Sequence, residues 1–242
     1  MAKTYEAISK SERLLHDEGS LGVSLSSDKH LTNRRNTKQM GDLKQKIELL
    51  GQTKNYRVFH FASSRKREGV STVVINLARF MVEEMSSKDI LLIDANLQQP
   101  VLHTAFDIPS SPGLSDALMG KVAYSESIYK AESDRINVMP CGTPISNETG
   151  RIEQKKFADL ISSIKNKYDY IFIDSSPLLV SSDSLSLAMA SDTTFLVIQA
   201  NETQWEVAEK AKLYLQDSAC SIEGVILSRV LHYIPQWIYK RL

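Results

Sequence analysis

The sequence has few cysteines, no long apolar run and no net charge, and each absence argues against a class of protein. Its two cysteines, Cys141 and Cys220, lie far apart and lack the spacing of metal ligands. We therefore expect reduced thiols rather than a disulfide framework or a zinc site. No apolar stretch reaches the roughly 20 residues that a membrane-spanning helix needs. The 29 basic and 29 acidic residues cancel, which gives no support to nucleic-acid binding.

Several signals of catalysis and targeting are missing as well. No GxSxG motif is present, and no GxGxxG motif follows the first predicted strand. The N-terminal sequence MAKTYEAISKSER is polar and lacks the apolar core of a signal peptide. We therefore expect a cytoplasmic protein that reaches a membrane only through a partner. The histidines are scattered without metal-ligand spacing, at positions 16, 30, 60, 103 and 232.

The composition changes along the chain and divides it into three parts. Residues 1–40 are rich in Ser, Lys, Asp and Asn, which predicts a flexible arm with one weak helix over residues 5–16. Residues 41–230 carry the apolar patterns of one folded domain. Residues 231–242 form an aromatic and basic tail.

Within the domain, short apolar runs alternate with amphipathic segments from Tyr56 onward. Strands that are apolar throughout, separated by helices, predict an α/β fold with a mostly parallel sheet and helices on both faces. Ligands of such sheets bind beyond the carboxyl ends of the strands. The polar residues that close apolar strands, Ser63, Asp94 and Asp174, are therefore candidate site residues.

Residues 59–78, FHFASSRKREGVSTVVINLA, are typical of a strand, a loop and the start of a helix. A phosphate-binding loop at this place would end in Gly-Lys-Ser/Thr, because backbone N–H groups, a lysine and a hydroxyl together hold phosphate and Mg²⁺. Gly69, Ser71 and Thr72 match that pattern, but Val70 stands in the place of the lysine.

The middle of this loop is also unusual. Lys66 and Arg67 occupy positions where small residues let such loops curl. Glu68 is predicted to be a solvated loop carboxylate, with a catalytic role as the alternative. An ordinary strand-to-helix turn is the alternative interpretation of the segment.

Two aspartates strengthen the interpretation as a nucleotide site. Asp94 closes the strand ILLI and Asp174 closes the strand YIFI. Aspartates at these positions can bind Mg²⁺ or orient an attacking group, although each could instead cap a helix or a loop.

Four motifs resemble those of the bacterial tyrosine autokinases of capsule and exopolysaccharide synthesis, in the superfamily of the MinD/ParA-type P-loop ATPases. That family has the approximate patterns SSxPGEGKST, LLIDADLRRP, YDYIIIDTPP and GVVLNRV. The linker FDIPSSPGLSDALMGK at residues 106–121 also resembles the family. The corresponding segments here are SSRKREGVST (63–72), LLIDANLQQP (91–100), YDYIFIDSSP (168–177) and GVILSRV (224–230).

The resemblance implies a P-loop fold that binds ATP and Mg²⁺ and phosphorylates tyrosines of its own C-terminal tail. It implies catalytic roles for Asp94 and Asp174, and Mg²⁺ ligation by these two residues and Ser71. It implies a membrane polysaccharide co-polymerase, or chain-length determinant protein, as the partner that holds the chain at the inner membrane. A homo-oligomer or a complex with a sister kinase is also implied. The residues that would bind the cofactor are Ser64, Arg65, Lys66, Arg67, Glu68, Gly69, Val70, Ser71, Thr72, Ser228 and Arg229.

The departures from the family pattern gather on the phosphate and base side of this site. The residues that the resemblance implies for Mg²⁺ binding are retained, because the family pattern is matched at Ser71, Thr72, Asp94 and Asp174. Because charge stabilisation is the main contribution of a phosphoryl-transfer enzyme, loss of the lysine is expected to impair chemistry more than folding. The substituted positions are Lys66 and Arg67 for Pro-Gly, Val70 for Lys, Asn96 for Asp, Gln98 and Gln99 for two arginines, and Ser228 for Asn.

Three functions stay open on this basis. One is an active autokinase in which Arg65, Lys66 or Arg67 replaces the missing lysine. Another is a non-catalytic regulatory module that binds the co-polymerase or a sister kinase. The last is a MinD/ParA-like positioning ATPase, although the loop does not match KGGxGKT.

The tail offers two candidate phosphoacceptors, Tyr233 and Tyr239. Aromatic packing beside Ile234, Trp237 and Ile238 is the alternative role for both.

Overall fold

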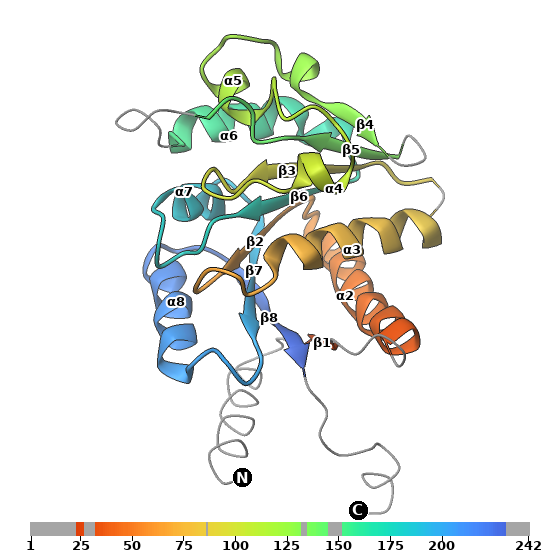
Figure 1. Ribbon diagram of the computed structural model, residues 1–242, viewed down its shortest axis with the longest axis vertical. Helices are drawn as coiled ribbons and strands as arrows, with labels where there is room; N and C mark the ends of the chain where they lie inside the picture. Colours follow the sequence, from red (N-terminus) through yellow and green to blue (C-terminus); the bar gives the residue numbers. More distant parts are fainter. Residues whose placement is uncertain (1–22, 27–31, 86, 132–134, 145–151, 231–242) are drawn as a thin grey trace, which may run out of the picture.

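The computed structural model describes residues 23–26, 32–85, 87–131, 135–144 and 152–230. These segments build a single sheet of eight strands with helices around it (Figure 1). In spatial order the strands run β1-β8-β7-β2-β6-β3-β5-β4. The strands are β1 (Val23–Ser26), β2 (Val58–Ser63), β3 (Ile90–Ala95), β4 (Tyr129–Ala131), β5 (Ile136–Met139), β6 (Tyr170–Ser175), β7 (Thr193–Gln199) and β8 (Ile222–Val230). The α-helices are α2 (Thr32–Lys54), α3 (Val70–Glu84), α4 (Leu102–Ala105), α5 (Leu114–Leu118), α6 (Gln154–Ile164), α7 (Asp183–Met189) and α8 (Trp205–Asp217), and two 3₁₀ turns cover Tyr124–Ser127 and Lys165–Lys167.

All pairings in this sheet are parallel except that of β4 with β5. Every residue of β2, β3 and β6 is buried, which explains why these strands are apolar throughout rather than alternating. The predicted α/β fold with a mostly parallel sheet is therefore confirmed.

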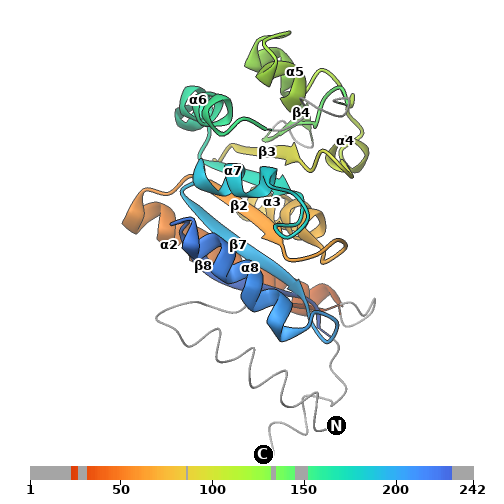
Figure 2. The same ribbon diagram turned by 90° about the vertical axis from the view of Figure 1, so that its left-hand side faces the viewer.

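Helices cover both faces of the sheet (Figure 2). On one face α2 and α3 pack on side chains such as Phe59, Phe61 and Phe172. On the other face α6, α7 and α8 pack on neighbouring residues of the same strands, because successive side chains of a strand point to opposite faces. Helix α3 buries one stripe at helical spacing, made of Val70, Val73, Val74, Leu77, Ala78, Met81 and Val82.

Regular structure begins before residue 41, where the sequence places the start of the domain. Helix α2 starts at Thr32, and the short strand β1 pairs in parallel with β8 at the edge of the sheet. The helix predicted over residues 5–16 and the tail at 231–242 lie outside the described residues. Within the described ranges, no helix has the length and apolar character needed to cross a membrane.

The parallel arrangement brings the carboxyl ends of β2, β3, β6, β7 and β8 to one edge of the sheet. The loops that leave this edge are residues 64–69, 96–101, 176–182 and 200–204. Open α/β sheets bind ligands at this edge, and all the predicted site residues that the structure describes lie there.

Candidate nucleotide site

The loop between β2 and α3 has the strand–loop–helix geometry expected from the sequence. Gly69 immediately precedes α3 with φ 94° and ψ 20°, in the left-handed region that glycine adopts without strain. Arg67 also has a positive φ, of 68°. Because a non-glycine residue is disfavoured in this region, other contacts must hold the loop in its curled shape.

Glu68 supplies several of those contacts, and the prediction of a solvated loop carboxylate is wrong. Its side chain is only 2% exposed. The backbone N–H groups of Ser64 and Arg65 donate to Glu68 Oε2 at 2.7 and 2.8 Å. The hydroxyls of Ser64 and Thr203 also donate to the carboxylate. A loop position usually implies exposure, but here the side chain turns inward because unpaired backbone amides need an acceptor.

Ser228, at the end of β8, ties the same loop from another direction. Its hydroxyl donates to the backbone carbonyl of Glu68 at 2.6 Å, and its side chain is buried against Gly69. The neighbouring Arg229 is exposed and donates to Gln199 Oε1 at 3.4 Å. The sequence predicted that both residues contact a cofactor, and that role stays a prediction.

Val70 packs inward rather than over the loop. Its side chain is 7% exposed and belongs to the hydrophobic cluster that contains Val73, Val74 and Phe61. An apolar side chain packed in this way cannot donate to a phosphate oxygen, so position 70 contributes no positive charge to the site.

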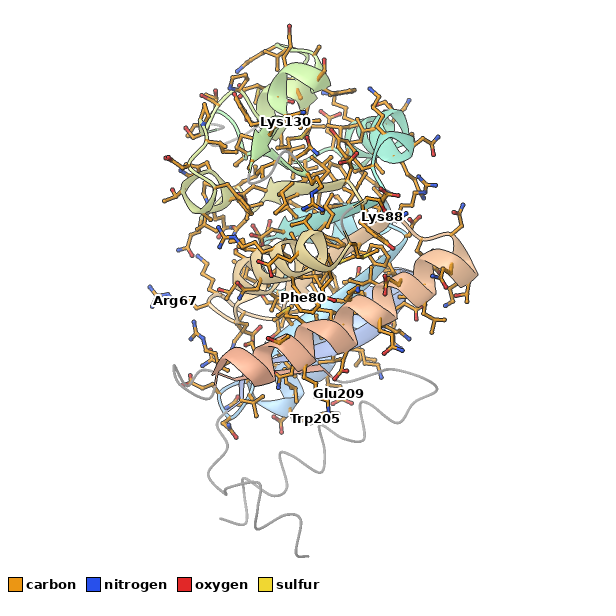
Figure 3. The ribbon with its side chains drawn as sticks, turned by 90° about the vertical axis from the view of Figure 1, so that its right-hand side faces the viewer. Arg67, Phe80, Lys88, Lys130, Trp205 and Glu209 are labelled. Carbon is orange, nitrogen blue, oxygen red and sulfur yellow. The ribbon has the colours of Figure 1, made fainter. Side chains whose placement is uncertain are left out.

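The three basic residues of the loop are exposed. The Arg65 guanidinium donates to the backbone carbonyl of Glu202 at 3.1 Å. Arg67 extends from the loop into solvent (Figure 3). Within the part of the chain that the structure describes, neither Lys66 nor Arg67 has an ion-pair partner, so both side chains are available to a ligand.

Asp94 lies buried at the carboxyl end of β3. Its Oδ2 accepts the backbone N–H groups of Val101 and Leu102 at 2.9 Å each, and Oδ1 accepts that of Asn96 at 3.3 Å. Burial raises the pKa of Asp94 to about 6, against the lowering effect of these amides and of His103. These contacts confirm in part the alternative that Asp94 caps a loop, because its carboxylate binds the backbone of the loop that leads into α4.

Asp174 sits directly beside Asp94, as its partner in the register of β3 and β6. It is completely buried, and neither carboxylate oxygen has a hydrogen-bond partner among the described residues. Burial and the neighbouring Asp94 carboxyl raise the pKa of Asp174 well above its usual range. The Ser71 hydroxyl faces Asp174 and opposes this rise, although the two lack the geometry of a hydrogen bond.

The orphaned carboxylate of Asp174, with the Ser71 hydroxyl beside it, fits a Mg²⁺ ion. Mg²⁺ prefers oxygen ligands and is held through one or two carboxylates, with waters and substrate phosphates completing its shell. The described residues contain no cluster of three or more His, Cys, Asp or Glu side chains that could hold a metal. Among these residues the site offers only a few oxygen donors, and a Mg²⁺ ion there would rely on waters and phosphate oxygens for the rest of its shell. Thr72, predicted to bind the cofactor, is exposed on the next position of α3.

His60, Ser175 and Thr194 form a buried polar network next to Asp174 that no motif of the sequence indicates. His60 contacts the Ser175 hydroxyl through Nε2 at 2.8 Å and the Thr194 hydroxyl through Nδ1 at 3.1 Å. Burial lowers the pKa of His60 to about 3, so the ring is neutral at ordinary pH. The signal in the sequence was a histidine inside an apolar strand, FHFA.

Thr203 and Ser176 were also missed, and no local sequence pattern could have identified them. Thr203 reaches Glu68 across 135 positions of sequence, and the Ser176 hydroxyl donates to Asn96 Oδ1 at 3.0 Å. The candidate phosphoacceptors Tyr233 and Tyr239 lie outside the described residues.

Comparisons with known proteins bear on the family and the fold of this chain. The sequence profile of a family described as an AAA domain matches residues 61–212. The tyrosine-protein kinase CpsD of Streptococcus agalactiae is 31% identical over 178 residues, which cover 73% of this chain and 77% of that protein.

Solved structures show the same fold. The kinase domain of the Escherichia coli tyrosine kinase ETK superposes with a TM-score of 0.80 at 18% identity, over 88% of this chain and 91% of that domain. The septum site-determining protein MinD of Pyrococcus horikoshii, solved with Mg-ADP, superposes with a TM-score of 0.61 at 23% identity, over 71% of this chain and 69% of MinD. The β2–α3 loop and the paired strand-end aspartates are consistent with these matches. The matches show that the chain belongs to the AAA domain family and, within it, to the bacterial tyrosine-protein kinases that include CpsD.

Proposed function

We propose that this chain is a kinase-like component of capsule or exopolysaccharide synthesis whose ATP chemistry is weakened or lost. It would act in the cytoplasm, at the inner membrane, by binding a polysaccharide co-polymerase, and would regulate chain length and export as a pseudokinase. ATP and Mg²⁺ are its proposed ligands. The observation that carries this proposal is the contrast between Asp174, an orphaned carboxylate suited to Mg²⁺, and Val70, an apolar side chain packed in the core.

The balance of charge in the site supports a loss of catalysis. Phosphoryl transfer needs fixed positive charge where negative charge develops on the transferred group. Glu68, Asp94 and Asp174 place three buried carboxyl groups around the loop, whereas its basic residues are all exposed. A Mg²⁺ ion could offset part of this imbalance, so binding of a Mg²⁺–nucleotide complex is compatible with the site even where transfer is slow.

The test is calorimetric titration of the full chain with ATP, with and without Mg²⁺, together with an assay of tyrosine phosphorylation. We expect weak binding that requires Mg²⁺ and no phosphotyrosine above background. Phosphorylation by the purified protein that disappears in Asp94→Ala would contradict the proposal.

An active kinase is the second candidate, favoured by the exposure of Lys66 and Arg67 and their lack of an ion-pair partner among the described residues. A cation displaced along the loop could reach the same phosphates. If so, the double variant Lys66→Ala/Arg67→Ala would abolish phosphorylation and weaken ATP binding at least about tenfold, the size expected for charge-assisted hydrogen bonds. Lys130→Ala is the control, because Lys130 is an exposed cation on β4, at the edge of the sheet away from this loop.

The partner is proposed from the family and needs its own test. The cytoplasmic segment of the co-polymerase, immobilised, should retain the full chain, and a scrambled segment should not. A sister kinase or a second copy of this chain are the other proposed partners, and sedimentation of the purified protein would detect the latter. No binding to nucleic acid is expected, because the net charge is zero.

A further inference from the structure

The carboxylate of Glu68 joins three segments of the nucleotide edge that are far apart in sequence. It accepts the backbone N–H groups of Ser64 and Arg65 at the start of the loop. It accepts the hydroxyl of Thr203, which in turn accepts the backbone N–H of Gln199 at 3.2 Å. The Glu68 carbonyl accepts the hydroxyl of Ser228.

No cation of the described residues forms an ion pair with this buried carboxylate, which is held by hydrogen-bond donors alone. Two backbone N–H groups and two hydroxyls point at its two oxygens. Hydrogen bonds to an ionised acceptor are shorter and stronger than neutral ones. Without the carboxylate, the amides of Ser64 and Arg65 would lose their acceptor, which is costly for backbone groups next to a buried side chain.

We propose that Glu68 is the positioning residue of this loop and that its carboxylate holds the loop curled without a lysine or a bound phosphate. Arg67 adopts its positive φ one residue before Glu68, so the strained part of the loop lies directly beside the group that anchors it. The anchored shape keeps the backbone of residues 67–72 at the start of α3, where N–H groups can face an anion.

The same contacts couple the loop to the segment 200–204 that leads into α8 (Figure 1). Thr203 binds the Glu68 carboxylate, and the carbonyl of Glu202 accepts the Arg65 guanidinium. A change that frees Glu68 is therefore expected to loosen both segments together.

Glutamine at position 68 separates the shape of the side chain from its charge. The amide oxygen of Glu68→Gln can still accept the N–H groups of Ser64 and Arg65. The amide NH₂ can donate to the hydroxyls of Ser64 and Thr203, because a hydroxyl accepts as well as donates. Glu68→Ala removes every one of these contacts.

The experiment is hydrogen–deuterium exchange on the full chain, read at residues 64–70 and 199–204, for wild type, Glu68→Gln, Glu68→Ala and Thr203→Val. We expect Glu68→Ala to speed exchange at Ser64 and Arg65 at least about tenfold, the effect of losing a hydrogen bond to a charged group. Glu68→Gln should change it less than threefold. Thr203→Val should give an intermediate increase in both segments.

Unchanged exchange at Ser64 and Arg65 in Glu68→Ala, with strand β3 still protected, would overturn the proposal. If the alanine variant does not fold, Thr203→Val decides the matter: exchange equal to that of wild type in both segments would overturn the proposal.

Titration with a nucleotide tests whether Glu68 also supports nucleotide binding. This part of the proposal rests on the proposed function. Titration with Mg-ADP should show at least wild-type affinity in Glu68→Gln, since a negative charge behind the loop is removed, and at least about tenfold weaker binding in Glu68→Ala. Equal affinity of wild type and Glu68→Ala would refute a positioning role in binding. Absence of binding by all variants would refute the nucleotide site itself, and the exchange experiment would still decide the role of Glu68.

Discussion

The buried pair Asp94 and Asp174 predicts an unusual dependence of stability on pH. Both carboxyl groups have raised pKa values, with burial as the main cause. Between the ordinary and the raised pKa, the folded protein holds more protons than the unfolded chain, so this contribution to stability falls as the pH rises. For Asp94 the rise from 3.8 to about 6 corresponds to a loss of about 3 kcal/mol that is complete above pH 6.

Asp174→Asn tests this reasoning, because the orphaned carboxylate makes no hydrogen bond that the substitution would break. Leaving a buried charged group without partners costs about 1–3 kcal/mol or more. We expect the variant to be more stable than wild type by about this amount at pH 7.5. The two proteins should be closest in stability near pH 4, where the folded carboxyl groups are protonated and about half of those in the unfolded chain are protonated too.

The assay is urea unfolding of both proteins without ligand at pH 4, 5, 6 and 7.5, followed by the same series with Mg²⁺. We expect Mg²⁺ to stabilise wild type above pH 6 and to leave Asp174→Asn unchanged. An equal difference in the free energy of unfolding between the two proteins at all four pH values would refute the assignment of a buried carboxyl pair with raised pKa values.

Asp169→Asn is the matched control. Burial alone would raise the pKa of Asp169, but the Lys88 ammonium at 2.8 Å and the Asp89 N–H lower it. The contribution of Asp169 to stability is therefore present above the ordinary pKa of an aspartate and is lost as the pH falls through its lowered pKa. The control variant should therefore be less stable than wild type at pH 7.5, the opposite sign to Asp174→Asn.

Three further predictions concern the loop and its surroundings. Val70→Lys should lose about 1–2 kcal/mol of stability, because a core valine is removed. In calorimetry it should bind Mg-ATP at least about tenfold more tightly than Val70→Met, because only lysine adds a positive charge. Equal affinities of the two variants would contradict the proposed loss of phosphate contacts. Gly69→Ala should lose about 1 kcal/mol or more in urea unfolding, because φ is 94°, whereas Gly41→Ala, within α2, should be neutral or stabilising. His60→Leu should lose about 1–3 kcal/mol of stability, because the Thr194 and Ser175 hydroxyls lose their ring partner. Wild-type stability should fall below pH 6.5, because the unfolded chain protonates a histidine that stays neutral when folded, and this fall should be smaller in the variant. An equal fall below pH 6.5 in both proteins would contradict this.

The sequence by itself was sufficient for the fold class and for the edge of the sheet at which the candidate site residues lie. Fully apolar strands can only be buried on both faces, so the segments around Phe61, Leu92 and Phe172 predicted a covered parallel sheet. A polar residue at the end of such a strand must lie at the carboxyl edge, which located Asp94 and Asp174. These inferences depend on local patterns alone.

The tertiary structure alone decided what each side chain at that edge does. The register of β3 and β6 sets Asp94 beside Asp174, and no local pattern encodes the register of strands 80 residues apart. Glu68 is buried because Thr203 and the amides of its own loop converge on it, and Val70 faces the core because of the direction in which α3 leaves the loop. Periodicity tells which residues are buried along one element, whereas partners across elements depend on how the whole chain packs.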